Sequence, residues 1–195
     1  MKIPKIKKER IHITYCCDDN YYSKLKISVL SLVTNSNHSI TIKLISDNIS
    51  SAHLSELKKI INIFKKGKTK HTLTVYKASL FLKKIPKNLI NDDFFVIKDR
   101  PDHKISSSAL IRLILPYIFN KKFIYLDADT IVNNDLWSLY NTNLSDFSIG
   151  AVISIGPLIA MHDKKHKVFF EYLKNDCFKN SYYFNSGVLL INPIK

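Results

Sequence analysis

Two aspartates, Asp127 and Asp129, follow directly after the apolar run Phe123–Leu126. Carboxylate oxygens are hard ligands that suit Mg²⁺ or Mn²⁺, and such a metal readily takes its further ligands from a diphosphate. In an extended segment, residues two apart point to the same side, so both carboxylates could approach one metal while Ala128 faces away. Open α/β sheets bind ligands beyond the carboxyl ends of their strands. The pair therefore suggests a nucleotide-diphosphate substrate.

Two other interpretations of this pair stay open. A D-x-D sequence is common and often only caps a turn. A phosphohydrolase of the haloacid dehalogenase type also ends an apolar strand with two aspartates and uses the first as a nucleophile. That motif has Thr or Val two positions after the second aspartate, whereas here Thr130 is one position after Asp129 and Ile131 is two positions after it. The apolar strand before the pair and the polar turn 133–135 after it favour the metal site.

Three further polar residues are candidates for ligand contacts. Asp18 and Asn20 lie in the turn after the first predicted strand, where they could contact a base or ribose or equally cap the next helix. This turn has no G-x-G-x-x-G, which disfavours a dinucleotide cradle. Arg112 lies within the apolar run 109–115, so we expect its guanidinium to have a fixed partner. That partner could be a structural carboxylate or a substrate phosphate or hydroxyl, unless the side chain snorkels to solvent.

Alternating strands and helices must position these residues. Strands are predicted at 11–17, 40–45, 71–76, 123–127 and 149–153. Helices are predicted after residues 18–20, from Ser50 or Ser51 to a stop at Gly67, and over 106–117, 135–140 and 164–174, with a loop over 91–104. Pro116 should limit the helix over 106–117 near its end. The alternation predicts one α/β sandwich domain with a largely parallel sheet.

The composition fits a single globular domain. The chain has 195 residues, 46% of them hydrophobic, with only 4 Gly and 6 Pro, which is enough for one substantial core. Its net charge of +14 comes mainly from lysine and could attract nucleotides, nucleic acid or an anionic membrane surface. Basic stripes with interleaved aromatic residues are absent, so no nucleic-acid partner is expected. No run of about 18 apolar residues could span a membrane.

The cysteines and two loop histidines carry no predicted chemistry. Cys16, Cys17 and Cys177 show no metal-ligand spacing, and the adjacent pair cannot easily close a disulfide, which fits a reducing, cytoplasmic setting. His103 and His162 have no second His or Cys at ligand spacing and are given no role.

Four segments together resemble glycosyltransferase family 8, namely residues 13–21, 106–116, 123–135 and 183–192. Their order and approximate spacing match over nearly the whole chain, with a likeness to bacterial lipopolysaccharide glucosyl- and galactosyltransferases. The resemblance implies a GT-A fold, the Rossmann-like α/β/α sandwich of nucleotide-diphospho-sugar transferases with a mixed, mostly parallel sheet. It also implies transfer of glucose or galactose from a UDP-sugar to a saccharide acceptor such as the lipopolysaccharide core, with retention of configuration.

The resemblance also implies roles for single residues. Carried over by position, Asp127 and Asp129 would hold Mn²⁺ (or Mg²⁺) on the diphosphate, and Asn185 would line the sugar pocket. Such a metal would stabilise the charge on departing UDP, so no strong general acid is required and no catalytic residue is assigned. The complete set implied to bind the UDP-sugar is Asp18 and Asn20 at the uridine, Arg112, Asp127, Ala128, Asp129, Ser154, Asn185, Ser186 and Gly187.

The chain departs from the family at two points. Ser154 stands where the family usually has an aspartate that contacts sugar hydroxyls. The sequence ends at Lys195, before the family's Asp-Gln-Asp segment and its His-x-x-Gly stretch, whose histidine is the third protein ligand of the metal. We therefore expect residues 1–195 to be a single donor-binding domain without the family's C-terminal portion, cytoplasmic or peripheral at the inner membrane. The alternative is a catalytically impaired UDP-sugar-binding remnant or an interaction module of the same fold.

Overall fold

The computed structural model describes residues 9–64, 67, 69–82, 111–154 and 184–193, which form one sheet with helices on both faces. The six strands lie in the order β3-β2-β1-β4-β6-β5. Strands β1, β2, β3 and β4 are parallel to one another, and β6 is antiparallel to both β4 and β5. The predicted mixed, mostly parallel sheet is confirmed. The strands are β1 Ile11–Cys16, β2 Ile40–Ile45, β3 Thr72–Tyr76, β4 Phe123–Leu126, β5 Ile149–Ile153 and β6 Phe184–Ile191.

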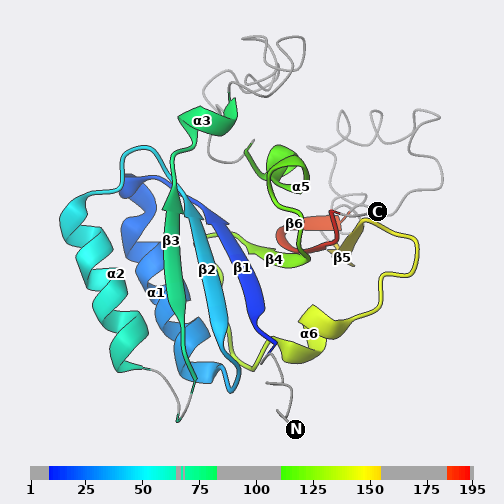
Figure 1. Cartoon of the computed structure of the whole chain (residues 1–195), viewed down its shortest axis with the longest axis horizontal. Helices are drawn as coiled ribbons and strands as arrows, with labels where there is room; N and C mark the ends of the chain where they lie inside the picture. The colour runs from blue at the N-terminus through cyan, green and yellow to red at the C-terminus, as the bar shows by residue number, and fades with distance from the viewer. Residues whose placement is uncertain (1–8, 65–66, 68, 83–110, 155–183, 194–195) are drawn as a thin grey trace, which may run out of the picture.

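Helices α1 (Tyr22–Asn35) and α2 (Ser51–Ile63) cover one face of the sheet, behind β1, β2 and β3 in Figure 1. The short helices α3 (Ser79–Leu82) and α5 (Leu115–Ile118) lie on the other side. Strand β1 shows why both faces are covered: Ile11, Ile13 and Tyr15 pack with α1 and α2, whereas Cys16 belongs to the core around α5. The alternation of side chains along a strand thus produces the sandwich.

The ends of α2 agree with the predicted signals. Ser50 is the N-cap, and its Oγ accepts a hydrogen bond from the His53 N–H at 3.2 Å. The helix ends at Ile63, and Gly67 follows with a φ of +52°, a left-handed conformation that glycine adopts without steric strain.

The predicted helix over 106–117 is not a continuous α-helix in its described part. A 3₁₀ turn, η4 (Arg112–Ile114), precedes α5, and Pro116 lies in the first turn of α5. Proline has no N–H to donate to the carbonyl of Arg112 four residues earlier, and its ring crowds that carbonyl, so the α-helical ladder is interrupted here. The chain leaves α5 only two residues after Pro116.

The remaining short helix starts later than expected. Helix α6 is Trp137–Asn141 rather than 135–140, because Asp135 lies before it and accepts a hydrogen bond from the Trp137 N–H at 2.7 Å. The expected loop over 91–104, the expected helix over 164–174, and Cys177, His103 and His162 lie outside the described residues. Within the described ranges, no helix is long and apolar enough to cross a membrane.

Candidate functional site

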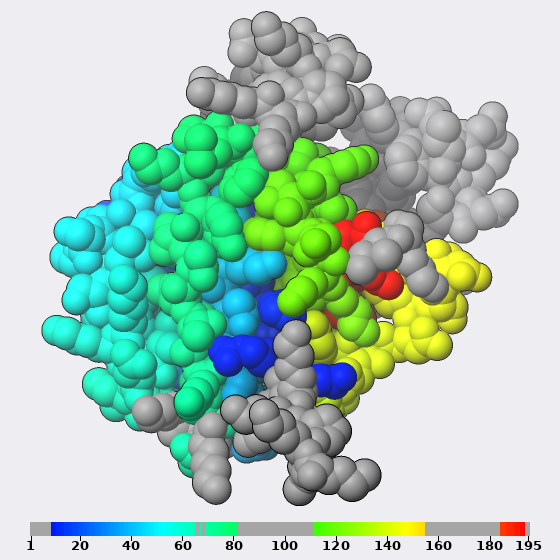
Figure 2. Space-filling model, viewed as in Figure 1, coloured from blue at the N-terminus to red at the C-terminus, as the bar shows by residue number. Residues whose placement is uncertain are grey.

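The strand order changes direction at β1 and β4, which are parallel neighbours with Ile13 opposite Ile124 and Thr14 opposite Tyr125. Their carboxyl ends therefore reach the same edge of the sheet. Because β6 is antiparallel to β4, with Leu126 opposite Val188, the amino end of β6 reaches that edge as well. Figure 2 shows β6 (red) at the surface between the light-green segment around α5 and the yellow segment of α6 and β5.

A cleft of about 460 Å³ opens at this edge, and five residues predicted from the sequence line it. Asp127 and Asp129 come from the end of β4, Ser154 from the end of β5, and Asn185 and Gly187 from the start of β6. The topology thus brings together residues that are up to 60 positions apart in the sequence. The other lining residues are Thr130, Val152, Ile153 and Val188.

Asp127 is held by groups on both sides of its carboxylate. Its Oδ1 accepts a hydrogen bond from the Tyr125 hydroxyl at 2.6 Å and lies 3.3 Å from Nη2 of Arg112. Burial raises the pKa of Tyr125, with a contribution from the nearby charge of Asp127, so the phenol stays protonated and donates. The main-chain N–H of Asp127 donates to the Gly187 carbonyl at 2.8 Å. These contacts fix the first carboxylate of the D-x-D sequence.

Arg112 has the fixed partner that its apolar surroundings predicted. Its Nη1 donates to both the main-chain oxygen and the hydroxyl of Ser186, at 3.1 and 3.0 Å, while Nη2 faces Asp127. The guanidinium also lies over the ring of Tyr125, 5.1 Å from its centre. A planar fork of donors suits such a bridge. Arg112 therefore connects the start of β6 to the end of β4.

Gly187 lets two oxygen atoms approach one point. A Cβ at this position would lie 2.9 Å from Oδ2 of Asp127, closer than real Cβ contacts, and 3.0 Å from Oδ1 of Asn185, tighter than most of them. The Gly187 N–H donates to that same Asn185 oxygen at 2.7 Å. Because these oxygens and the Asp129 carboxylate are hard donors, the residues fit Mn²⁺ or Mg²⁺. No group of three His, Cys, Asp or Glu side chains that could hold a metal occurs among the described residues.

The chain turns directly after Asp127, contrary to the extended geometry assumed from the sequence. The N–H and hydroxyl of Thr130 both donate to the Asp127 carbonyl, at 3.2 and 2.8 Å. This local side-chain bond competes with continuation of the strand. Ala128 is only 7% exposed and packs in the core with α1, while Asp129 is exposed. The two carboxylates therefore still face away from Ala128, and any contact of Ala128 with a donor would come from its backbone.

Asp18 and Asn20 lie in the turn beyond β1 and do not line the cleft in the described part of the chain. Asp18 caps the 3₁₀ helix η1 (Asp19–Tyr21) and accepts a hydrogen bond from the Tyr21 N–H at 3.2 Å. Asp19 ties the turn to α2, because its Oδ1 accepts from the Ser50 N–H at 3.0 Å and lies 2.7 Å from Nδ1 of His53. The Ser50 bond and then the His53 bond lower the pKa of Asp19.

Several residues of the site were not predicted as such. Tyr125 carries a signal that could have identified it, because a residue two before Asp127 on a strand points to the same side. Val152 and Ile153, which are 67% and 52% exposed, have the sequence of ordinary strand residues and carry no such signal. Both lie beyond a shift of the β5–β6 register between Ala151 and Val152, and this pairing depends on distant parts of the chain.

Comparison with known proteins gives one consistent result. The model of glycosyl transferase family 8 matches residues 12–195. A Haemophilus influenzae protein that carries the name "Putative glycosyltransferase" is 27% identical over 94% of this chain and 49% of its own length. General stress protein A of Bacillus subtilis is 26% identical over 95% of this chain and 57% of its own length. The chain thus spans about half the length of these relatives.

One solved structure gives the same fold. The galactosyltransferase LgtC, determined in complex with donor and acceptor sugar analogs, superposes with a TM-score of 0.62 and 24% identity. The superposition covers 95% of this chain and 59% of LgtC. The GT-A fold expected from the sequence is confirmed by this match and by the sheet.

Proposed function

The chain belongs to glycosyl transferase family 8, and from that premise we propose that it binds a UDP-hexose and transfers the hexose to a saccharide acceptor with retention of configuration. Glucose and galactose are the proposed sugars, and a lipopolysaccharide core is the proposed acceptor. The observation that supports this function is the convergence of Asp127, Asp129, Asn185 and Gly187 on one cleft at the carboxyl ends of the strands. Doubly wound sheets bind nucleotides at that position.

In this proposal, Asp127 and Asp129 hold Mn²⁺ (or Mg²⁺) against the diphosphate. When bound, the metal would stabilise the negative charge that collects on departing UDP. Arg112 keeps the Asp127 carboxylate oriented through Oδ1, so that Oδ2 is directed toward the space beside Gly187. Fixed donors and charges of this kind need no reorganisation during reaction.

In this proposal, Ser154 and Asn185 would contact the sugar. The Ser154 hydroxyl can hydrogen-bond a sugar hydroxyl without adding a charge, and the Asn185 carboxamide can bind another. The exposed side chains of Val152 and Ile153 offer an apolar surface beside these polar groups. A cleft with apolar walls and few polar groups is typical of small-molecule sites. Asp18 and Asn20 are proposed to contact the uridine.

The charge of the chain supports an anionic donor and suggests where the protein works. A net charge of +14 attracts nucleotides over long range and also attracts an anionic membrane surface. The charge therefore supports the proposed peripheral contact at the inner membrane, and the cytoplasmic setting is proposed from the cysteine pattern. A nucleic-acid partner is not part of this proposal.

Calorimetric titration of UDP, with Mn²⁺ or with EDTA, tests the proposed function. Asp129→Ala is the sharpest variant, because Asp129 is exposed, whereas Asp127 also accepts the bond from Tyr125. We expect Mn²⁺ to strengthen UDP binding, and we expect Asp129→Ala to weaken UDP binding in Mn²⁺ about tenfold or more. Asp146→Ala, at an exposed aspartate between α6 and β5, is the matched control.

Two outcomes would contradict parts of the proposal. Equal UDP affinity in Mn²⁺ and EDTA, or an unchanged affinity of Asp129→Ala, would exclude the metal site. Metal-dependent binding without release of UDP from UDP-glucose or UDP-galactose in the presence of a saccharide acceptor would instead identify a sugar-nucleotide-binding module.

A further inference from the structure

Helix α1 contacts the turn that carries the two aspartates. Ser28, Ser31 and Asn35 lie three and four residues apart, so they share one face of the helix. The Ser28 hydroxyl lies 3.2 Å from the hydroxyl of Thr130. Ser31 accepts a hydrogen bond from the Val132 N–H at 3.0 Å, and Asn35 donates to the Val132 carbonyl at 2.7 Å. One helix face thus contacts Thr130 and Val132, two of the first three residues that follow the D-x-D sequence.

The hydroxyl groups behind this turn form a chain with only one possible direction. Thr130 Oγ1 uses its single hydrogen to donate to the Asp127 carbonyl at 2.8 Å, because a carbonyl can only accept. Ser28 must therefore donate to Thr130, and Tyr15, 3.0 Å from Ser28, must donate to Ser28. Burial raises the pKa of Tyr15, so this phenol stays protonated. Hydrogen bonds that point the same way polarise and strengthen one another.

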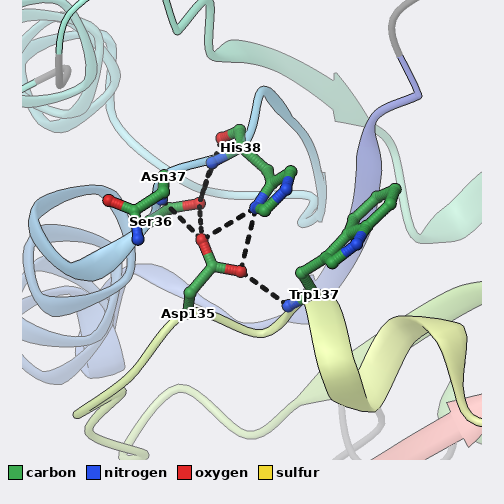
Figure 3. Close-up of polar contacts among 5 residues, drawn as sticks. All are labelled: Ser36, Asn37, His38, Asp135 and Trp137. Atoms are coloured by element: carbon green, nitrogen blue, oxygen red, sulfur yellow. Dashed lines mark hydrogen bonds and ion pairs between the residues drawn. The ribbon is translucent and has the colours of Figure 1, made fainter.

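The far end of the same segment is also attached to α1, as Figure 3 shows. Asp135 accepts hydrogen bonds from the N–H of Asn37 and the hydroxyl of Ser36, directly after the helix. It also contacts Nδ1 of His38 and accepts a hydrogen bond from the Trp137 N–H. The segment from Asp127 to Asp135 is therefore anchored at both ends and in the middle. Its position depends on α1 as well as on β4.

We propose that Ser28, acting through Thr130, is a positioning residue that sets the Asp127–Asp129 turn for metal-dependent donor binding. The inference rests on the proposed function, because it concerns the same pair of carboxylates. Ser28 is 0% exposed, so it cannot touch a substrate and can act only through its neighbours. Its hydroxyl chain ends on the Asp127 carbonyl, the group that also closes the turn to Thr130. Loss of these hydrogen bonds would let both carboxylates shift together.

Helix stability alone does not explain a serine at this position. In a buried helical position, alanine has the higher helix propensity and buries no polar group. A buried hydroxyl is tolerated here because the hydroxyl hydrogens of Tyr15, Ser28 and Thr130 each have an acceptor. Removal of a group that hydrogen-bonds and orients a metal ligand commonly lowers metal affinity by about 10- to 100-fold.

The test measures how strongly Mn²⁺ improves UDP binding, as the ratio of the UDP Kd in EDTA to the Kd in Mn²⁺. The full chain is compared with Ser28→Ala, Thr130→Val, the double variant and Thr130→Ser. Thr142→Val is the matched control, because its hydroxyl makes a similar local bond to the Ser138 carbonyl at 3.2 Å, away from the cleft.

We expect Ser28→Ala and Thr130→Val each to lower this ratio about three- to tenfold, with the Kd in EDTA unchanged. The double variant should lose no more than Thr130→Val alone, because the two residues act in one chain. Thr130→Ser should restore the ratio, and Thr142→Val should leave it unchanged. A purely structural role would instead lower the melting temperature and leave the ratio as it is.

A wild-type ratio in folded Ser28→Ala and Thr130→Val would overturn the inference while leaving the proposed function intact. If the UDP affinity of the wild-type protein is the same with and without Mn²⁺, both the inference and the proposed function are overturned. If Ser28→Ala does not fold, the comparison of Thr130→Val with the wild type and with Thr130→Ser decides, because Thr130→Val replaces only the hydroxyl through which Ser28 acts by a methyl group, Thr130→Ser keeps that hydroxyl, and both keep Ser28 in place.

Discussion

Gly187 is needed in this site for space. Its φ is not in the left-handed region, since Gly67 is the glycine with positive φ in the described part of the chain. The missing Cβ instead lets the carboxylate of Asp127 and the carboxamide of Asn185 converge. A glycine inside a strand often marks such a close approach. This role depends on atoms from β4, so the sequence of β6 alone could not show it.

Gly187→Ala should therefore damage metal-dependent donor binding. The added methyl group would meet Oδ2 of Asp127 at 2.9 Å and must displace one of the two oxygens. We expect UDP affinity in Mn²⁺ to fall about tenfold or more, with a smaller change in EDTA. Calorimetric titration under both conditions measures this.

Gly150→Ala is the matched control on the adjacent strand β5. Its new Cβ would meet Cδ2 of Leu144 at 2.7 Å, the flexible end of a side chain that can move aside. It should lower stability without changing the effect of Mn²⁺ on UDP binding. An unchanged Mn²⁺ effect in Gly187→Ala would show that the two oxygens do not act together.

Residue types, for the two aspartates, and the family resemblance, for the other residues, identified much of the candidate site. Asp127, Asp129, Asn185, Gly187 and Ser154 were all predicted to bind the donor, and all line the cleft. Their role as donor contacts stays a prediction. The supporting groups were harder to predict, because the contacts of Ser28 and Thr130 join positions 102 residues apart. Only the packed fold brings such hydroxyl groups together.

At the scale of elements, strand β1 carries a histidine that should make the protein sensitive to acid. Burial lowers the pKa of His12 to about 4, and the charges of Lys43, Lys121 and Arg10 contribute. The unfolded chain takes up this proton near pH 6.5. Stability from this group is therefore complete above about pH 6.5 and is lost as the pH falls toward about 4. Burial lowers the pKa of His71 as well, so its effect has the same sign.

His12→Gln should weaken this acid sensitivity, because glutamine does not titrate. Urea unfolding at about pH 7 and about pH 5 should show a smaller decrease in the free energy of unfolding for the variant than for the wild type. After allowance for the partial exposure of His12, the difference is on the order of 1 kcal/mol. An equal decrease in both proteins would mean that His12 takes up its proton normally in the folded state.

The helices and strands were predictable where local signals are strong. Strands β2 and β5 have the predicted bounds, and α2 starts after Ser50, one of the two predicted caps. The break between η4 and α5 was missed, although Pro116 made an interruption foreseeable. The direction of β6 and its place between β4 and β5 could not be derived from the residues alone, because pairing across the sheet depends on contacts distant in sequence.

For the whole molecule, helix α1 has two tasks. One face packs Leu25, Val29 and Leu32 into the core of the sheet, and the adjacent serines hold the turn beyond β4. The core of the domain and the carboxylates of the cleft are thereby connected through one helix. This arrangement explains how an exposed turn can keep a defined geometry on a stable scaffold.

The central claim is that the cleft at the ends of β4, β5 and β6 holds the metal and the diphosphate. NMR spectra of the labelled chain with UDP and small amounts of Mn²⁺ test it directly, because the paramagnetic ion broadens the signals of nearby amides. We predict early loss of the Thr130, Gly187 and Val188 signals, while the amides at Ile60–Ile63 at the end of α2 stay sharp and excess Mg²⁺ restores the spectrum. Broadening centred elsewhere, or spread evenly over the chain, would contradict the account.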